Sequence, residues 1–193
     1  MNKSRWSSIW HQMRQISSCN PQAVLEVGSG NGLLRAIAKT YGISIETVDI
    51  DPELMPDHVA SATSLPFKDS AYDLTCAFQV LEHFPFEQSL LAFRELVRVS
   101  KKDILVSLPD SGKTVQIQWR IPKISKVDAL IPIPLPRTRH SFDGEHYWEI
   151  GKRGYSPKQV RENLLAIGGV KLVREFRSKD NPFHRFYHFD KRI

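Results

Sequence analysis

Hydrophobic positions along the chain follow two patterns, one typical of helices and one typical of buried strands. Over residues 4–16 apolar side chains recur every three or four residues and predict an amphipathic helix, which Asn20-Pro21 ends. Its apolar stripe consists of Trp6, Ile9, Trp10, Met13 and Ile16. The same spacing predicts helices over residues 33–41, 86–99 and 156–167. Short apolar runs predict strands over residues 23–27, 43–50, 58–62, 73–78, 103–108, 170–177 and 183–189.

The order of these elements predicts a mostly parallel sheet with helices on both faces. Residues 51–57 leave room for only about one helical turn between two strands, although parallel strands usually need a longer crossover. The last two strands are joined by a short turn and predict an antiparallel hairpin. Four aromatic and basic residues of the last strand share one face: Phe183, Arg185, Tyr187 and Phe189. We interpret this face as sheet packing and not as a nucleic-acid surface.

Three glycines follow the first predicted strand at alternate positions: Gly28, Gly30 and Gly32. A strand that turns through glycines into a helix brings backbone N–H groups close to a ligand. The spacing differs from the dinucleotide-binding G-x-G-x-x-G, because Leu33 stands at the third glycine position. Glu26 would repel a pyrophosphate but suits a cationic ligand. The loop therefore predicts a site for a positively charged cofactor.

Asp49 lies near the end of the second predicted strand, about 20 residues past the glycines, where a carboxylate can accept ribose hydroxyls. Glu26, the glycines and Asp49 together resemble the class I S-adenosylmethionine (SAM)-dependent methyltransferases, specifically the methyltransferase type 11 group. Residues 61–73 resemble the family's acidic-Ala-x-x-Leu-Pro-Phe-x-Asp-x-x-Phe-Asp segment, with Ser61 in place of the acidic residue. Residues 78–83 resemble its x-x-V-L-E-H segment.

This resemblance implies the fold and the place of the cofactor. We expect an α/β, single-domain, Rossmann-like seven-stranded mixed sheet over residues 1–193, with an antiparallel C-terminal hairpin. SAM would lie at the carboxyl ends of the strands. Residues 1–20 would form a helix over the cofactor cleft, and the proline-rich segment 111–148 a substrate-side insertion. The expected cofactor-binding residues are Glu26, Gly28, Ser29, Gly30, Gly32, Asp49, Ile50, Ser61, Ala62, Thr63, Phe78 and Gln79.

Three histidines are candidate catalytic residues, because an imidazole can take a proton from a hydroxyl or amine near neutral pH: His83, His140 and His146. A purely structural role for His83 is the alternative. Tyr147 and Trp148 are candidate substrate contacts, and a lid or dimer contact is the competing interpretation of their segment. Some relatives bind Mg²⁺ through Glu-x-x-Glu-His. Gln79 replaces the first glutamate here, so we expect no metal.

The amino-acid composition indicates the cellular compartment but says little about the substrate. The 193 residues are 41 % hydrophobic, contain two cysteines and carry a formal net charge of +6. Two cysteines fit reduced thiols better than a disulfide framework, and the first residues lack the apolar core of a signal peptide. No apolar run approaches the ~20 residues of a membrane span. We therefore expect a cytoplasmic protein, as a monomer or a homodimer.

The expected reaction is methyl transfer from SAM to an oxygen or nitrogen nucleophile of a small molecule or glycan. An RNA methyltransferase is one alternative, because a basic chain favours acidic partners. A non-catalytic SAM-binding partner subunit is another. An NAD-dependent enzyme is disfavoured by the glycine spacing and by Glu26.

Overall fold

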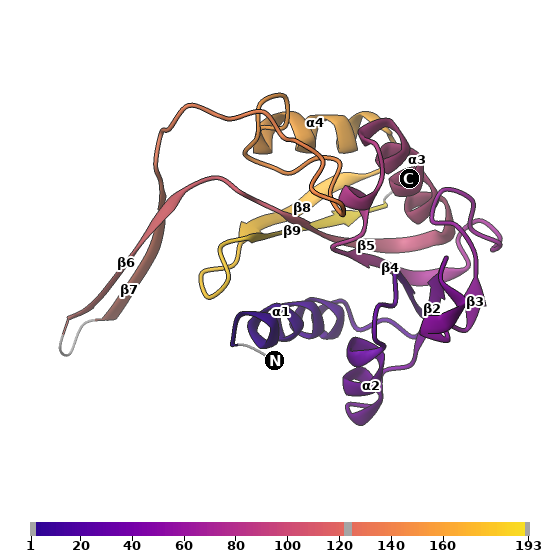
Figure 1. The fold of residues 1–193 in the computed structure, drawn as a ribbon. Coiled ribbons are helices and arrows are strands. Elements are labelled where there is room, and N and C mark those ends of the chain that lie inside the picture. Colours follow the sequence, from indigo (N-terminus) through magenta and orange to yellow (C-terminus); the bar gives the residue numbers. More distant parts are fainter. Residues whose placement is uncertain (1–2, 122–124, 192–193) are drawn as a thin grey trace.

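The computed structural model describes residues 3–121 and 125–191, and its centre is a seven-stranded mixed sheet (Figure 1). The strand order is β3-β2-β1-β4-β5-β9-β8. β9 runs antiparallel to both neighbours, and the other pairings are parallel. This confirms the expected sheet and its C-terminal hairpin. The strands are β1 (Val24–Val27), β2 (Ile45–Asp49), β3 (His58–Val59), β4 (Tyr72–Phe78), β5 (Ser100–Pro109), β8 (Lys171–Arg177) and β9 (His184–Asp190).

Helices cover both faces of the sheet (Figure 1). On one face α1 (Lys3–Cys19) and α2 (Leu33–Thr40) bury Ile16 and Leu34 against strand residues such as Leu105. On the other face α3 (Phe86–Val99) and α4 (Pro157–Ala166) form the larger core, which contains Phe93 and Leu164. Strand order reverses between β1 and β4, so the carboxyl ends of these strands are where the fold leaves room for a ligand.

The orientation of α1 differs from the prediction. Three members of its apolar stripe, Ile9, Met13 and Ile16, are buried as expected, but Trp6 and Trp10 are 49 % and 54 % exposed. The reason is that the buried face includes polar side chains, which rotates the helix away from its most hydrophobic direction. These polar side chains are Ser8, Gln12 and Gln15. Residues 1 and 2 of the expected leading segment lie outside the described part of the chain.

The crossover between β2 and β3 contains a single 3₁₀ turn, η1 (Pro52–Leu54), which confirms the short connection. β3 covers two residues, and not residues 58–62 as predicted. Its pairing ends because the Ser61 hydroxyl turns back to the Thr63 hydroxyl at 2.9 Å. The Ala60 N–H still donates to the Asp49 carbonyl, which keeps the following residues beside the end of β2.

The face of β9 that carries aromatic and basic residues is packed inside the protein. Tyr187 and Phe189 are fully buried. Arg185 is held by the carboxylates of Asp110 and Glu175, at 2.7 and 2.6 Å. The sheet-packing interpretation is therefore confirmed for Arg185, Tyr187 and Phe189, which are not available as a nucleic-acid surface. Phe183 precedes β9 and is 39 % exposed, so it is not part of this packing.

Residues 111–148 begin with a two-stranded hairpin that projects away from the body of the protein (Figure 1). Its strands are β6 (Thr114–Ile121) and β7 (Ser125–Pro132). The chain then returns to the main sheet, where Trp148 is buried beneath α3. In the part of the chain that the structure describes, no helix has the length and apolar character to cross a bilayer.

Candidate functional site

A cavity of about 530 Å³ opens at the carboxyl ends of β1 and β4. Its size suits a small organic ligand or cofactor. Six of the predicted cofactor-binding residues line it: Glu26, Gly28, Ser29, Gly30, Phe78 and Gln79. The wall is completed by residues that the sequence did not single out, from α1 (Ser4, Arg5, Ser8, Ile9 and Gln12), from the start of α2 (Asn31, Leu33 and Leu34) and from the end of the chain (Asn181 and His184).

The glycines of the loop serve two different purposes. All three have positive φ angles, +81° at Gly28, +49° at Gly30 and +69° at Gly32, a region that other L-residues rarely adopt. Around Gly30 and Gly32 an added Cβ would meet no protein atom within 4 Å, so their backbone is open to a ligand. At Gly28 the added atom would lie 2.3 Å from Val80 Cγ2. Gly28 is therefore required for packing as well as for its backbone angle.

Glu26 is the decisive charged group of the cavity. Its side chain is 5 % exposed, and among the described residues Oε2 has no hydrogen-bond partner. Burial raises the pKa of Glu26 to about 8, with the Asp49 charge adding to the effect and Arg35 opposing it. A buried carboxylate without a partner is costly, and a cationic ligand group would relieve that cost. The carboxylate thus fits the charged amino end of SAM.

The remaining predicted cofactor residues lie outside the cavity wall. Asp49 accepts a hydrogen bond from the Ser29 hydroxyl at 3.3 Å and one from the Asp51 N–H at 3.1 Å. Ile50 follows it with 69 % exposure, an apolar surface on which a flat ring could rest. The segment from Ser61 to Thr63, with Ala62 buried, begins directly after Ala60, whose N–H donates to the Asp49 carbonyl. The structure therefore joins these residues to the glycine loop as a neighbouring surface.

A polar contact between the two ends of the chain closes one side of the cavity. Ser8 Oγ lies 2.9 Å from His184 Nδ1, and the Asn181 side-chain amide donates to the same oxygen at 3.1 Å. Burial lowers the pKa of His184 to about 4, so this imidazole is neutral at pH 7. The sequence offers one signal for this wall, the polar positions Ser8 and Gln12 inside the apolar pattern of α1. It offers none for His184.

The three candidate catalytic histidines come together beyond the end of β4. His83 ends a 3₁₀ turn, η2 (Leu81–His83), four residues after Gln79. Its ring lies 5.2 Å from the His146 ring, centroid to centroid, and its Nδ1 donates to the Glu145 carbonyl at 3.0 Å. In a neutral imidazole with Nδ1 protonated, Nε2 keeps its lone pair and can accept a proton. His140 Nε2 donates to the His146 carbonyl at 2.8 Å, which makes His140 a support for the cluster.

Carboxylates surround the histidines. His146 Nδ1 lies 3.1 Å from Glu149 Oε1. Glu82 is fully buried, neither of its oxygens has a hydrogen-bond partner among the described residues, and burial raises its pKa to about 8. Glu82, His83 and His146 each offer a donor atom within 4.8 Å of the others, and so do Asp143, His146 and Glu149. This donor set is compatible with a divalent cation, which the sequence did not predict.

Trp148 is not a substrate contact. It is 1 % exposed, packs edge-on against Phe86, and its Nε1–H donates to the Ser89 hydroxyl at 2.9 Å. The neighbouring Tyr147 is 46 % exposed and still faces solvent. The predicted substrate segment therefore contributes its histidines and Tyr147 to the surface, and its tryptophan to the core.

Comparison with known proteins agrees with this fold. Residues 25–107 match the family model described as "Methyltransferase domain". The fold is that of the class I methyltransferases. A solved example is the magnesium protoporphyrin IX methyltransferase of Synechocystis PCC 6803 with bound S-adenosylhomocysteine (SAH). It superposes with a TM-score of 0.62 at 13 % identity, over 98 % of this chain and 84 % of that one.

Two curated methyltransferases are also similar in sequence. A tRNA (carboxymethyluridine(34)-5-O)-methyltransferase from Xenopus tropicalis is 26 % identical over 202 residues, or 86 % of this chain. Norajmaline N-methyltransferase from Rauvolfia serpentina is 27 % identical over 100 residues, or 43 % of this chain. The matches cover 29 % and 34 % of those proteins, so the chain spans about a third of the length of these relatives.

Proposed function

We propose that this chain is a SAM-dependent methyltransferase that transfers a methyl group to an oxygen or nitrogen nucleophile of a small molecule or glycan. The observation that carries the proposal is the buried Glu26 side chain, which lines a cavity beside an open glycine loop and whose Oε2 has no hydrogen-bond partner among the described residues. Such a site favours a cationic cofactor over the pyrophosphate of a dinucleotide.

Each predicted residue has a defined task in this proposal. Glu26 binds the ammonium group of the cofactor, and the backbone of Gly30 and Gly32 approaches its methionine part. Asp49 accepts the ribose hydroxyls, and Ile50 supports the adenine ring. The residues from Ser61 to Thr63 contact the adenine edge, with Phe78 and Gln79 at the base of the cavity. The α1 residues that line the cavity cover the bound cofactor and exclude water.

SAM supplies the methyl group from its positively charged sulfur. The protein must hold the acceptor in line with that methyl group and remove the proton that the nucleophile loses. His83 suits the second task, because its Nδ1 is fixed by the Glu145 carbonyl and Nε2 is the accepting atom. His146, which faces Glu149 at 3.1 Å, is the neighbouring group that can relay the proton or orient the acceptor.

A thermal-shift measurement with SAM, SAH and NAD⁺ in parallel tests the cofactor. A ligand at 100 times its dissociation constant stabilises the protein by about 2.7 kcal/mol, which appears as a rise in Tm of several degrees. We expect a rise with SAM and SAH and none with NAD⁺, and a loss of the rise in Glu26→Gln. A rise with NAD⁺ alone would contradict the proposal. Turnover of labelled SAM by the chain alone then separates an enzyme from a non-catalytic subunit.

RNA is a second candidate acceptor, favoured by two observations. The relative that matches 86 % of this chain is a tRNA methyltransferase, and the chain carries a net charge of +6. Binding through phosphates falls steeply with added salt. Affinity for a transfer RNA that drops at least tenfold between about 50 and 200 mM salt would favour this acceptor class over a small molecule.

The cysteines support a cytoplasmic compartment. Cys19 and Cys76 are free thiols, and Cys76 is buried in the core. Thiols that do not pair fit a reducing environment. We therefore place the reaction in the cytoplasm.

A further inference from the structure

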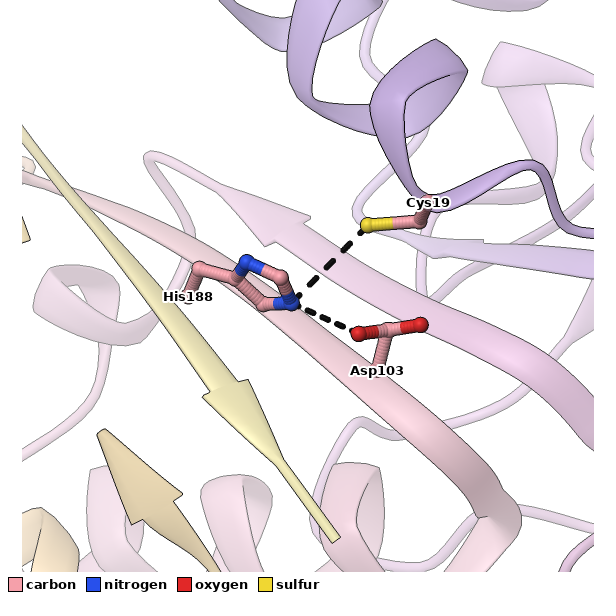
Figure 2. Close-up of side chains that lie close together, drawn as sticks. All are labelled: Cys19, Asp103 and His188. Atoms are coloured by element: carbon pink, nitrogen blue, oxygen red, sulfur yellow. Dashed lines mark hydrogen bonds and ion pairs between the residues drawn. The ribbon is translucent and has the colours of Figure 1, made fainter. Parts of the chain in front are cut away.

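A second group of side chains with metal-ligating atoms lies at the opposite ends of the strands from the glycine loop. Cys19 is the last residue of α1, Asp103 lies near the start of β5, and His188 lies on β9 (Figure 2). β1, β4 and β5 run parallel, so the start of β5 is at the amino-terminal edge of these strands, away from the proposed SAM site. The proposed function uses none of these three residues.

The three side chains converge on one point. His188 Nε2 lies 2.6 Å from Asp103 Oδ1 and 3.8 Å from Cys19 Sγ, so both neighbours face the same ring nitrogen (Figure 2). All three donor atoms lie within 4.8 Å of one another. A nucleophilic Cys–His–Asp triad needs the thiol and the carboxylate on different ring nitrogens, because the carboxylate orients the base. This arrangement therefore cannot serve as a nucleophile with its base.

Cys19 is a free, partly buried thiol at the end of α1. A thiolate is a metal ligand as well as a nucleophile, so metal binding is the chemistry that this arrangement still allows.

We propose that Cys19, Asp103 and His188 bind a transition-metal ion of the Zn²⁺ type. Zinc takes thiolate sulfur, imidazole nitrogen and carboxylate oxygen in tetrahedral sites, at about 2.3, 2.0 and 2.0–2.2 Å. Ligand atoms at those lengths are roughly 3.3–3.6 Å apart in a tetrahedron. The observed separations of 2.6 and 3.8 Å lie on either side of this range, so small side-chain rotations complete the geometry.

The surroundings supply charge, access and a place for a fourth ligand. Asp190 is directly opposite Asp103 in the antiparallel pairing, and it lies two residues from His188, so these three side chains share one face. They line an open pocket of about 360 Å³ with Cys19, where Asp190 or a water can complete the shell. Lys102 contacts the other Asp103 oxygen at 3.3 Å and leaves Oδ1 directed at His188.

The ion would tie three elements together. It would join the end of α1 to the sheet, and the beginning of α1 lines the proposed SAM cavity. Binding displaces the thiol proton of Cys19 and requires a lone pair on His188 Nε2, so affinity falls as pH is lowered. The site is a structural clamp, and its existence does not depend on the methyltransferase proposal.

The test uses the full chain, stripped with a chelator and titrated with ZnCl₂ by calorimetry. We expect a tight site whose affinity falls at least about 100-fold in Cys19→Ser and in His188→Gln and is unchanged in His146→Gln. His58→Gln is the matched control, because His58 Nε2 also contacts a carboxylate, Glu46 Oε1 at 2.5 Å, but no thiol lies in the contact. This variant is expected to bind Zn²⁺ like the unmodified protein.

Two results would overturn the proposal. One is the absence of Zn²⁺ binding by the unmodified chain. The other is binding that survives Cys19→Ser but is lost in His146→Gln, which would place the ion at the histidine cluster beyond β4. If a variant does not fold, the absorption spectrum of Co²⁺ bound to the unmodified protein tests whether Cys19 is a ligand. A thiolate-to-cobalt charge-transfer band supports the site, and a bound-cobalt spectrum without that band overturns it.

Discussion

Gly28 and Val80 are packed so closely that a β-carbon on Gly28 would lie 2.3 Å from Val80 Cγ2. The contact joins the loop after β1 to the segment after β4, and both segments contribute residues to the cavity wall. Val80 also leads directly into η2, which carries His83. One contact therefore sets the spacing between the proposed cofactor site and the candidate proton acceptor.

Gly28→Ala should destabilise the protein by about 2–4 kcal/mol, from overpacking and from an L-residue with positive φ. Gly30→Ala is the matched control, because an added Cβ there meets no atom within 4 Å. It should lose only about 1 kcal/mol, from backbone strain. The double variant Gly28→Ala/Val80→Ala should recover part of the loss. Urea unfolding measures all of these, and equal losses at Gly28 and Gly30 would contradict the packing role.

SAM affinity should depend on pH through Glu26. Because the pKa of the free carboxyl is about 8, the ligand-free protein holds this proton near pH 6, and a cationic ligand must displace it. Affinity should therefore rise between about pH 5.5 and 7.5, by at most tenfold per pH unit. Calorimetry in buffers of different ionisation enthalpy would detect the released proton.

Two variants define the Glu26 experiment. Glu26→Gln should bind SAM more weakly and without the pH slope, since the amide does not ionise. Glu53→Gln, at an exposed glutamate of η1, should keep the slope. A slope that persists in Glu26→Gln would assign the proton to another group.

His83→Gln should lower kcat by about 10²- to 10⁴-fold, the usual contribution of a positioned general base. The KM for SAM should change little, because His83 lies outside the cavity wall. His140→Gln should have a smaller effect, since the His140 ring contacts the backbone of His146. Steady-state rates over a pH series make the comparison. A kcat that is unchanged in His83→Gln would leave His83 with a structural role.

Asp110→Asn should cost about 3–5 kcal/mol of stability, because it removes the buried carboxylate that two partly buried guanidinium groups share. Arg185 keeps its contact with Glu175, but Arg177 is left with carbonyl oxygens as its partners. Asp110 is 2 % exposed and contacts Arg185 at 2.7 Å and Arg177 at 3.5 Å. Glu162→Gln is the surface control. Its pair with Lys158, 3.8 Å apart and mostly exposed, should contribute less than about 1 kcal/mol. Guanidinium unfolding that gave equal losses would contradict the buried network.

The sequence predicted features that depend on neighbouring residues. The Ser156–Pro157 start of α4 was found because the cap is local: Ser156 and Gln159 bond to each other across four residues. The glycine loop was found for the same reason. The burial of Trp148 depends on Ser89, 59 residues away, and the cavity wall depends on Ser8 and His184, 176 residues apart. Contacts between residues so far apart in the sequence leave no periodic pattern in it.

The hairpin within residues 111–148 was missed for another reason. β6 alternates apolar and polar residues in the way that predicts a strand, with Val115, Ile117 and Trp119 on one side. The prolines in residues 111–148 instead favoured the interpretation of this segment as a substrate-side insertion. All three of these side chains are exposed, so the pattern does not report a core.

The position of β9 has a consequence for how the chain assembles. β9 is the last strand in sequence, yet it lies between β5 and β8. During synthesis from the amino terminus, β8 emerges before the strand it must pair with, and β5 keeps an unpaired edge until β9 arrives. His184 and His188 both lie on β9. The ligand cavity and the proposed metal clamp therefore both stay incomplete until β9 has joined the sheet, and a ribosome-bound chain that stops at β8 has neither.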